Sequence, residues 1–377
     1  MERRKTRGRW FKNRRVLALL ILAALVALTS VLIFNRDRIS MDSISRAIHY
    51  RRLGTAAQTD LFQFHNSATN TFVTLGEGLA VASSSGLTVY DRTGGISYSA
   101  IFSMGRPMIR ENGGFVLAYD LGGRAIQMGS AREALLRLDW EYPLIDVSVN
   151  ENGWMVVSCE QNGPRGVVTV LNAQGTPIWR WTSDRQYVLQ AVLAPDNRTL
   201  AILTLTDTGG EILWYATDSP EADPGAVFSY QGEVFFDLWF YNRRNLAVIS
   251  SNLLLYLSDS GEILGEFRFS DRYLRGYDPG GDTVALYLSP HETGIGGNLV
   301  LVSNVGEIRE IEIQGTPLDI SLSGRYLAAL FIDRLVLFRN GTPYATFEGT
   351  EGMTQVITRE DGSVFRLSNS RARLLIP

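Results

Sequence analysis

Six polar residues recur at one position of a repeated pattern along the chain, and their types could form a binding site. The third or fourth residue of successive, otherwise apolar segments is polar; these residues are Asp146, Gln190, Asp237, Arg275, Asp319 and Gln355. If the segments line a common channel, three carboxylates and one guanidinium would form a ring that holds a small polar ligand or a cation. The alternative, which we favour, is that these groups solvate the channel or bond to the backbone of a neighbouring segment, because buried polar groups need partners.

Aromatic residues give a second candidate, a partner-binding surface. Six of the seven tryptophans lie between residues 140 and 239, and the run VFFDLWFYNRR adds phenylalanines, a tyrosine and two arginines. Trp, Tyr and Arg dominate the hot spots of protein interfaces, so we consider Trp239, Tyr241, Arg243 and Arg244 as a partner surface. The more frequent use of such residues is core packing, and we favour it here.

Other catalytic or metal-binding patterns are absent from the sequence. There is no G-x-S-x-G, P-loop or H-E-x-x-H motif, and the three histidines, His49, His65 and His291, are far apart. The one cysteine, Cys159, lies in an apolar segment and is predicted to be a small buried side chain rather than a reactive thiol. We therefore expect no catalytic residue, no cofactor and no metal site, and a protein that is not an enzyme.

A four-strand unit that recurs along the chain must position these residues. The stretch 143–181 contains four short runs rich in β-branched and aromatic residues, separated by turn sequences such as Asn-Glu-Asn-Gly and Asn-Ala-Gln-Gly. The same unit fits the chain eight times, at about 70–103, 106–140, 143–181, 187–231, 233–269, 273–313, 316–348 and from 352 onward. Four-stranded units at this period are typical of a β-propeller.

The last unit lacks one strand, and an unassigned strand precedes the first unit. Residues 60–65, DLFQFH, form this additional strand. Pairing it with the last unit would close the ring and remove an open sheet edge. We predict an all-β, eight-bladed propeller; seven blades remain an alternative if the second or eighth unit is misassigned, and a β-sandwich is a weaker one because eight units are too many for it.

The third unit carries a family resemblance. Its segment VVTVLNAQGTPIWRW resembles the repeat of quinoprotein-like propellers, in which a strand ends in Asp or Asn, a short turn with Gly follows and the next strand bears Trp. LLLYLSDSGEILGEF and LVLVSNVGEIREIEI are similar without the Trp, and the related WD40 pattern fits less well, since Gly-His and blade-end Trp-Asp pairs are missing. The resemblance implies the fold; the vicinal cysteine pair of quinoprotein enzymes cannot exist in a chain with one cysteine.

The amino-terminal region predicts a membrane anchor. Residues 1–34 hold eight Lys or Arg and one Glu, and Val16 to Phe34 form an uncharged apolar run of 19 residues, about the length that spans a bilayer as a helix. By the positive-inside rule, the tail 1–15 is cytoplasmic and the rest extracytoplasmic. The alternative is a cleaved signal peptide, which the run's length and the missing A-x-A site disfavour.

The segment between anchor and propeller, residues 35–59, is predicted to be a partly helical stalk. Within it, Ile44, Ala47 and Ile48 lie on one helical face and three arginines on the other, so this helix either lies on the membrane or only spaces the propeller domain, 60–377. The residues after Phe34 carry 28 basic and 38 acidic side chains, which argues against nucleic acid as a partner. The layout resembles bacterial membrane-anchored extracytoplasmic propeller proteins.

The sequence supports two hypotheses on function. The first is a membrane-tethered, non-enzymatic binding or scaffold module for a protein or cell-envelope ligand. The second is a degenerate propeller enzyme, a lyase, hydrolase or oxidoreductase, with its site in the channel. The second requires at least two carboxylates that converge on one substrate, with one pKa displaced.

Overall fold

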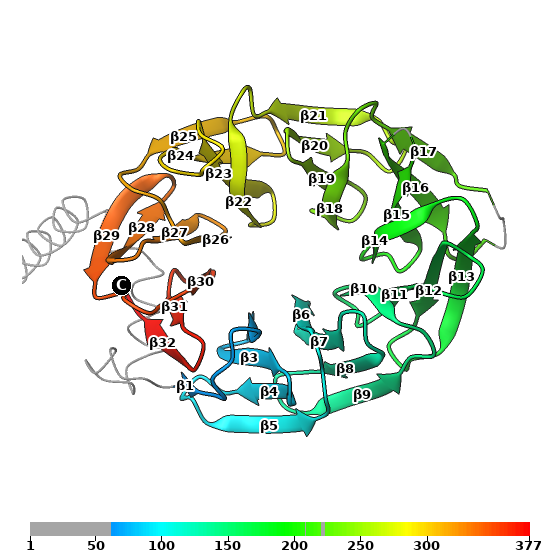
Figure 1. The fold of residues 1–377 in the computed structure, drawn as a ribbon, viewed down its shortest axis with the longest axis horizontal. Helices are drawn as coiled ribbons and strands as arrows, with labels where there is room; N and C mark the ends of the chain where they lie inside the picture. The colour runs from blue at the N-terminus through cyan, green and yellow to red at the C-terminus, as the bar shows by residue number, and fades with distance from the viewer. Residues whose placement is uncertain (1–61, 208, 220–222) are drawn as a thin grey trace, which may run out of the picture. The chain divides into compact units, whose positions relative to one another are not determined.

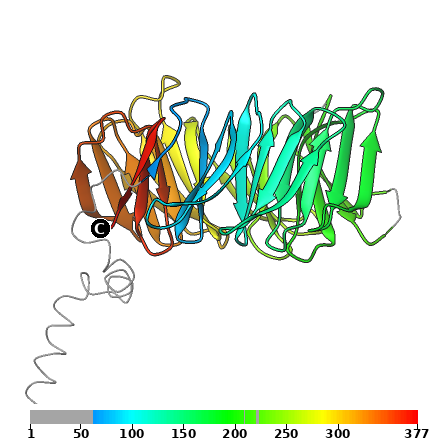
Figure 2. The same ribbon diagram turned by 90° about the horizontal axis from the view of Figure 1, so that it is seen from below.

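The computed structural model describes residues 62–207, 209–219 and 223–377, which form eight four-stranded antiparallel sheets arranged as blades around a central channel (Figures 1 and 2). The innermost strands are β2 (Thr71–Leu75), β6 (Pro107–Asn112), β10 (Leu144–Val149), β14 (Tyr187–Leu193), β18 (Phe235–Phe240), β22 (Tyr273–Pro279), β26 (Asp319–Ser323) and β30 (Gln355–Thr358). The second strands are β3 (Gly78–Ser83), β7 (Phe115–Asp120), β11 (Met155–Cys159), β15 (Thr199–Thr206), β19 (Leu246–Ser250), β23 (Thr283–Ser289), β27 (Tyr326–Leu330) and β31 (Val364–Leu367).

The two outer positions of each blade complete the sheets. The third strands are β4 (Gly86–Tyr90), β8 (Ala125–Gly129), β12 (Gly166–Leu171), β16 (Gly209–Ala216), β20 (Leu253–Leu257), β24 (Asn298–Ser303), β28 (Arg334–Arg339) and β32 (Arg371–Leu375). The outermost strands are β5 (Ile96–Ile101), β9 (Ala134–Asp139), β13 (Pro177–Ser183), β17 (Ala226–Ser229), β21 (Ile263–Arg268), β25 (Ile308–Glu312), β29 (Thr342–Glu348) and, in the eighth blade, β1 (Phe62–Gln63). The prediction of eight blades is confirmed, and the seven-bladed and sandwich alternatives are wrong.

The amino-terminal strand closes the ring, as predicted. β1 pairs with β32, so the last sheet has the order β1-β32-β31-β30. Phe62 is fully buried at this seam, with its ring 5.2 Å from that of Phe365 and 6.0 Å from that of Tyr90 in the first blade. The hydroxyl of Tyr90 donates to the carbonyl of Gln63 at 2.9 Å, so the seam is held by aromatic packing and by hydrogen bonds to the neighbouring blade.

Burial follows the position of a strand within its blade. Strands β11 and β12 are buried at every residue, whereas the outermost strand β13 is mostly exposed. The core lies between neighbouring blades; one cluster joins Ile202 and Tyr215 of the fourth blade to Val168 and Trp181 of the third. Because both faces of the two middle strands are covered, these strands are continuously apolar rather than alternating.

The antiparallel order places the connections on two faces. We call the face that carries the turns between second and third strands, and the connections to the next innermost strand, the upper face. The turns between first and second strands, and between third and fourth strands, lie on the lower face, and β32 also ends there. The predicted tail, transmembrane helix and stalk, residues 1–15, 16–34 and 35–59, lie outside the described residues. Within the described ranges, no helix has the length and hydropathy needed to cross a membrane.

Candidate functional site

The innermost strands of three successive blades place polar residues at one level of the channel. In β10, β14 and β18 the pairing register shifts by one residue, and Asp146, Gln190 and Asp237 are the first residues after that shift. The equivalent residue of β22 is Gly276. Arg275 is the bulged residue and is exposed, so it does not belong to this ring; the bulge, which the apolar pattern could not reveal, displaces the register by one.

Several channel residues bond to the backbone of the next blade. The Oε1 atom of Gln190 accepts the amide of Leu238 at 3.0 Å, and Oδ2 of Asp319 accepts the amide of Val356 at 2.8 Å. Asp278 does the same with the amide of Leu322 at 2.6 Å. For Gln190 and Asp319 the structural interpretation that the sequence favoured is therefore observed, since these carboxylate and amide oxygens link neighbouring innermost strands.

Asp278 and Asp319 have raised pKa values. Burial raises the pKa of Asp278 to about 7 against its backbone hydrogen bond, and the nearby Asp319 carboxylate adds to the effect. Burial likewise raises the pKa of Asp319 to about 6. Asp278 was not predicted as a channel residue, because it lies within the turn-like sequence Tyr-Asp-Pro-Gly-Gly; in the structure its strand continues to Pro279.

A second polar group centres on Asp146, which is almost fully buried. Its Oδ1 atom accepts the hydroxyl of Tyr119 at 2.9 Å and lies 3.5 Å from a guanidinium nitrogen of Arg110. Oδ2 has no hydrogen-bond partner among the described residues. Burial raises the pKa of Asp146 against the opposing effects of Arg110 and Tyr119, so the charge of Arg110 compensates this carboxylate only in part.

Arg110 also faces Asp237 of the fifth blade. Burial alone would lower the pKa of Arg110, but Asp146, Tyr119 and Asp237 together raise it. Asp237 accepts the hydroxyl of Tyr277 at 2.7 Å, and burial, with this carboxylate, raises the pKa of Tyr277. Arg110 is the fourth residue of its innermost strand, so it would have been found if the repeated polar position, the third or fourth residue of each innermost strand, had been extended to the second blade.

The channel contains two cavities, which we name the aromatic compartment and the acidic compartment. The aromatic compartment has a volume of about 590 Å³ and is lined by the second to sixth blades, including Arg110, Gln190 and Asp237. The acidic compartment, of about 510 Å³, is lined by Asp278, Asp319 and Gln355 among others. Glu111 and Pro279 border both, and their strands β6 and β22 face each other across the shorter diameter of the ring (Figure 1).

The aromatic compartment joins residues from both predicted sites. Trp239, Tyr241 and Arg243 line it together with Gln190 and Asp237. Trp239 stacks on Tyr277, with ring centroids 6.4 Å apart and an angle of 19°. The ring of Tyr241 meets that of Tyr256 edge-on at 5.3 Å.

Arg244 differs from the other three residues of the predicted partner surface. It is exposed in the turn after β18, 4.0 Å from Asp259, and does not line the compartment. Both Trp239 and Tyr241 pack against the core between the fifth and sixth blades, as favoured for the aromatic run.

The three aspartates of the predicted ring do not share one cavity. Asp237 lines the aromatic compartment, Asp319 lines the acidic compartment, and Asp146 lies beneath Arg110 and lines neither. In the described part of the chain, no three His, Cys, Asp or Glu side chains lie close enough together to hold a metal ion. Cys159 is buried, as predicted, and burial raises the pKa of its thiol.

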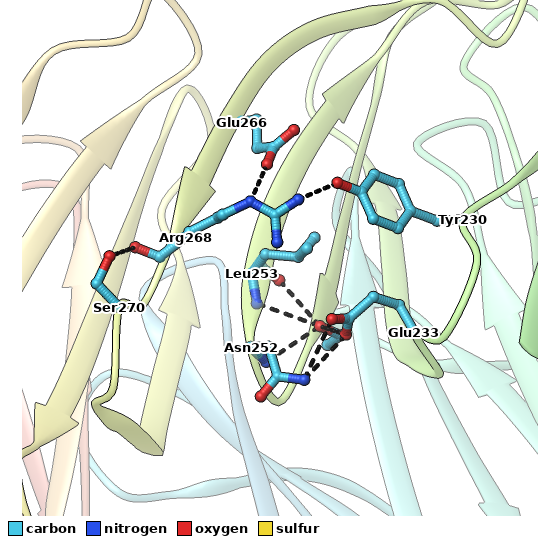
Figure 3. A network of polar contacts seen from close by, with 8 residues as sticks. Tyr230, Glu233, Asn252, Leu253, Glu266, Arg268 and Ser270 are labelled. Carbon is cyan, nitrogen blue, oxygen red and sulfur yellow. Dashed lines mark hydrogen bonds and ion pairs between the residues drawn. The ribbon is translucent and has the colours of Figure 1, made fainter.

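The upper face carries a further pocket of about 790 Å³, the upper pocket, between the fifth and sixth blades. Its polar wall is internally bonded (Figure 3): Arg268 lies between Glu266 and the hydroxyl of Tyr230, and Glu233 accepts from Asn252 at 3.2 Å. The loop residues Ser270 and Asp271 both have left-handed backbone conformations, with φ values of 49° and 61°. The wall is therefore held in one geometry before any partner binds.

Exposed apolar side chains of four successive blades lie on the same face as this pocket. Seven of them lie on the upper face, all from the fourth to the seventh blades: Tyr187, Val234, Phe236, Tyr273, Ile295, Leu318 and Ile332. The other large exposed apolar side chains of the described residues lie on outermost strands or, like Val305, in a lower-face turn. We call these seven residues the upper apolar patch.

Comparison with known proteins identifies a matching family and similar solved structures. Residues 49–270 match a family described as a family of unknown function, DUF5711. The C-terminal WD40 domain of Sif2 aligns with a TM-score of 0.59 and 14% identity over 85% of this chain and 98% of that domain. BamB from Moraxella catarrhalis aligns with a TM-score of 0.53 and 14% identity over 84% of this chain and 99% of its own. At these identities the likeness shows the fold alone, and it agrees with the WD40-like propeller inferred from the repeats. None of the curated proteins matches the chain.

Proposed function

The chain belongs to the DUF5711 family, and we propose that it is a non-enzymatic binding module that is tethered to the cell membrane and engages a protein partner outside the cytoplasm through the upper apolar patch. The observation that carries this proposal is the gathering of seven exposed apolar side chains on one face of four neighbouring blades. Apolar side chains left exposed on one face are typical of interaction surfaces.

Several features of the patch suit a protein rather than a small molecule. Large aromatic side chains, Tyr187, Phe236 and Tyr273, are spread over three blades, and the upper pocket opens beside Tyr273. Aromatic anchors around a partly apolar pocket are typical of interface hot spots. Because Arg268 and Glu233 are already held by neighbouring side chains, little ordering accompanies binding.

The proposed membrane tether is inferred from the sequence. The apolar run Val16–Phe34 and the basic tail before it support a single-pass anchor with a cytoplasmic amino terminus. β1 runs from the lower face toward the upper face, so the described chain begins at the lower face. The alternative of a channel enzyme receives less support, because Asp146, Asp237 and Asp319 of the predicted ring do not converge on one cavity. Asp278 and Asp319 do share the acidic compartment and have raised pKa values, but each already accepts a backbone N–H of the next blade, which gives both carboxylates a structural role.

The proposal is tested by site-specific photo-cross-linking of the full chain in its own membranes. A photoreactive phenylalanine analogue placed at Phe236 or Tyr273 should cross-link to the same partner protein, whereas one at Val305 on the lower face should not. Val305 is a matched control because it is also apolar and exposed. Equal products from all three positions, or none from Phe236 and Tyr273, would refute a partner site on the upper face.

The topology has a separate test. A cysteine introduced at Val305 should react with a membrane-impermeant maleimide in intact cells, while the native Cys159 stays unlabelled because it is buried. Labelling of the introduced cysteine only after the cells are lysed would place the propeller in the cytoplasm instead.

A further inference from the structure

The aromatic compartment presents three polar groups with unused hydrogen-bonding capacity, from the second, fourth and fifth blades. Arg110 contacts Asp146 through one guanidinium nitrogen, and its side chain keeps 43% of its exposure. Gln190 uses Oε1 for the amide of Leu238, and no described residue accepts a hydrogen bond from its Nε2. Asp237 uses Oδ2 for the hydroxyl of Tyr277, and Oδ1 has no bond among the described residues.

These three groups form an arc with opposite charges at its ends. Arg110 lies in the second blade, Gln190 in the fourth and Asp237 in the fifth, and all three line the same cavity. The arc therefore offers a guanidinium donor at one end, a carboxylate acceptor at the other and an amide donor between them. Gly276 occupies the equivalent position of the sixth blade, so no side chain fills that place in the ring.

The rest of the compartment has an apolar and aromatic part beside a polar rim, to which Glu111, Asn112, Ser148, Glu151, Asn242 and Arg243 contribute. Val192, Leu193 and Leu238 line it, together with Trp239 and Phe240. Its volume of about 590 Å³ falls within the usual range of small-molecule sites. Because its lining combines apolar side chains with charged groups of both signs, the compartment suits a ligand that has an apolar part and charges of both signs.

We propose that the aromatic compartment binds a small zwitterion of the size of an amino acid or dipeptide, with its carboxylate on Arg110 and the amide of Gln190, its ammonium group on Asp237, and its side chain against Trp239 and Phe240. A ligand with one charge would pair with only one end of the arc. The charged group at the other end, the guanidinium or the carboxylate, would then be partly desolvated without a charged contact from the ligand, which is unfavourable. Charge-assisted hydrogen bonds at both ends of the arc match a ligand that carries both signs. This site is separate from the upper apolar patch and does not depend on the proposed protein partner.

The test is binding of free amino acids and Gly-X dipeptides to the purified full chain in detergent, measured by saturation-transfer NMR and titration calorimetry. Saturable binding is expected for some of these zwitterions at concentrations up to about 10 mM. The N-acetylated and the C-amidated forms of the best ligand should each bind roughly tenfold more weakly or worse, because each loses one charged contact.

Variants locate the site. Asp237→Asn retains an acceptor for Tyr277 but removes the charge, and Gln190→Glu retains an acceptor for the amide of Leu238 but repels a carboxylate. Each should lower the affinity roughly tenfold or more with an unchanged circular dichroism spectrum. Asp319→Asn in the acidic compartment is the matched control and should leave the affinity unchanged.

Three results would overturn the proposal. The first is the absence of saturable binding by any zwitterion. The second is equal affinity for the blocked forms, or binding of neutral polyols only. The third is loss of binding in Asp319→Asn but not in Asp237→Asn or Gln190→Glu, which would place the ligand in the acidic compartment. If one of the two site variants unfolds, the other decides the outcome.

Discussion

Replacing Arg110 by Met should destabilise the propeller in a pH-dependent way. The guanidinium lies 3.5 Å from the buried carboxylate of Asp146, a separation worth about 5 kcal/mol at an effective dielectric constant of about 20. Because the Arg110 side chain keeps 43% of its exposure, solvent screens the pair, and we expect a net loss of about 2 kcal/mol at pH 8. Burial raises the pKa of Asp146, and removal of Arg110 raises it further.

The pH dependence follows from that direction. A carboxyl group with a raised pKa in the folded state binds its proton more tightly there than in the unfolded chain, so acidification favours the folded state. The deficit of Arg110→Met should therefore be smaller at pH 5 than at pH 8, because a protonated Asp146 needs no counterion. Equilibrium urea unfolding of the wild type, both single variants and Arg110→Met/Asp146→Asn at the two pH values measures this. A deficit that is the same at pH 5 and pH 8, or a double variant no more stable than Arg110→Met, would refute the reasoning.

Three further predictions concern the seam, the acidic compartment and the thiol. Phe62→Ala should lower the free energy of unfolding by about 3–5 kcal/mol, and amide hydrogen exchange should accelerate first in the eighth blade. The control Phe235→Ala removes an equally buried ring away from the seam and should not accelerate exchange there first. Identical exchange patterns in the two variants would contradict closure by β1. Asp278→Asn should stabilise the protein by roughly 2 kcal/mol at pH 8 and not at pH 4. Burial raises the pKa of this carboxyl to about 7 in the folded protein, so the unfolded chain loses the proton at lower pH and the wild type loses stability as the pH rises toward 7. Thermal melts at both pH values check this, and a variant that is less stable than the wild type at pH 8 would argue against it. Cys159 should react with a thiol reagent only after urea unfolds the chain, because it is 1% exposed and burial raises its pKa; rapid labelling of the native protein would contradict this burial.

The blade number and the closing strand could be predicted because they depend on local signals. Each blade has four runs of strand-forming residues and turn sequences that end them, and these signals are independent of the rest of the fold. The missing fourth strand of the last unit, together with DLFQFH before the first, predicts the seam directly, and β1 pairs with β32 in the structure.

The polar residues that face the channel were predicted only in part, because the pairing register of each innermost strand depends on its bulge. Asp146, Gln190 and Asp237 follow the register shifts, so counting from the start of each segment aligned them correctly. The same count selected Arg275 in β22, where the shift gives Gly276 instead. One residue of displacement turns a side chain to the opposite face of a strand, and the sequence contains no simple marker for it.

The sequence by itself determined the repeat, the ring closure and part of the set of polar side chains that face the channel, since these follow from strand and turn patterns within about 40 residues. Only the tertiary structure decided which of these side chains meet. Arg110 joins Asp146 from the next blade and faces Asp237 from the far side, and it lies in the cavity that Trp239 also lines. The physical reason is that ring closure brings together blades separated by more than a hundred residues, and their distance across the channel depends on bulges and core packing rather than on any local pattern.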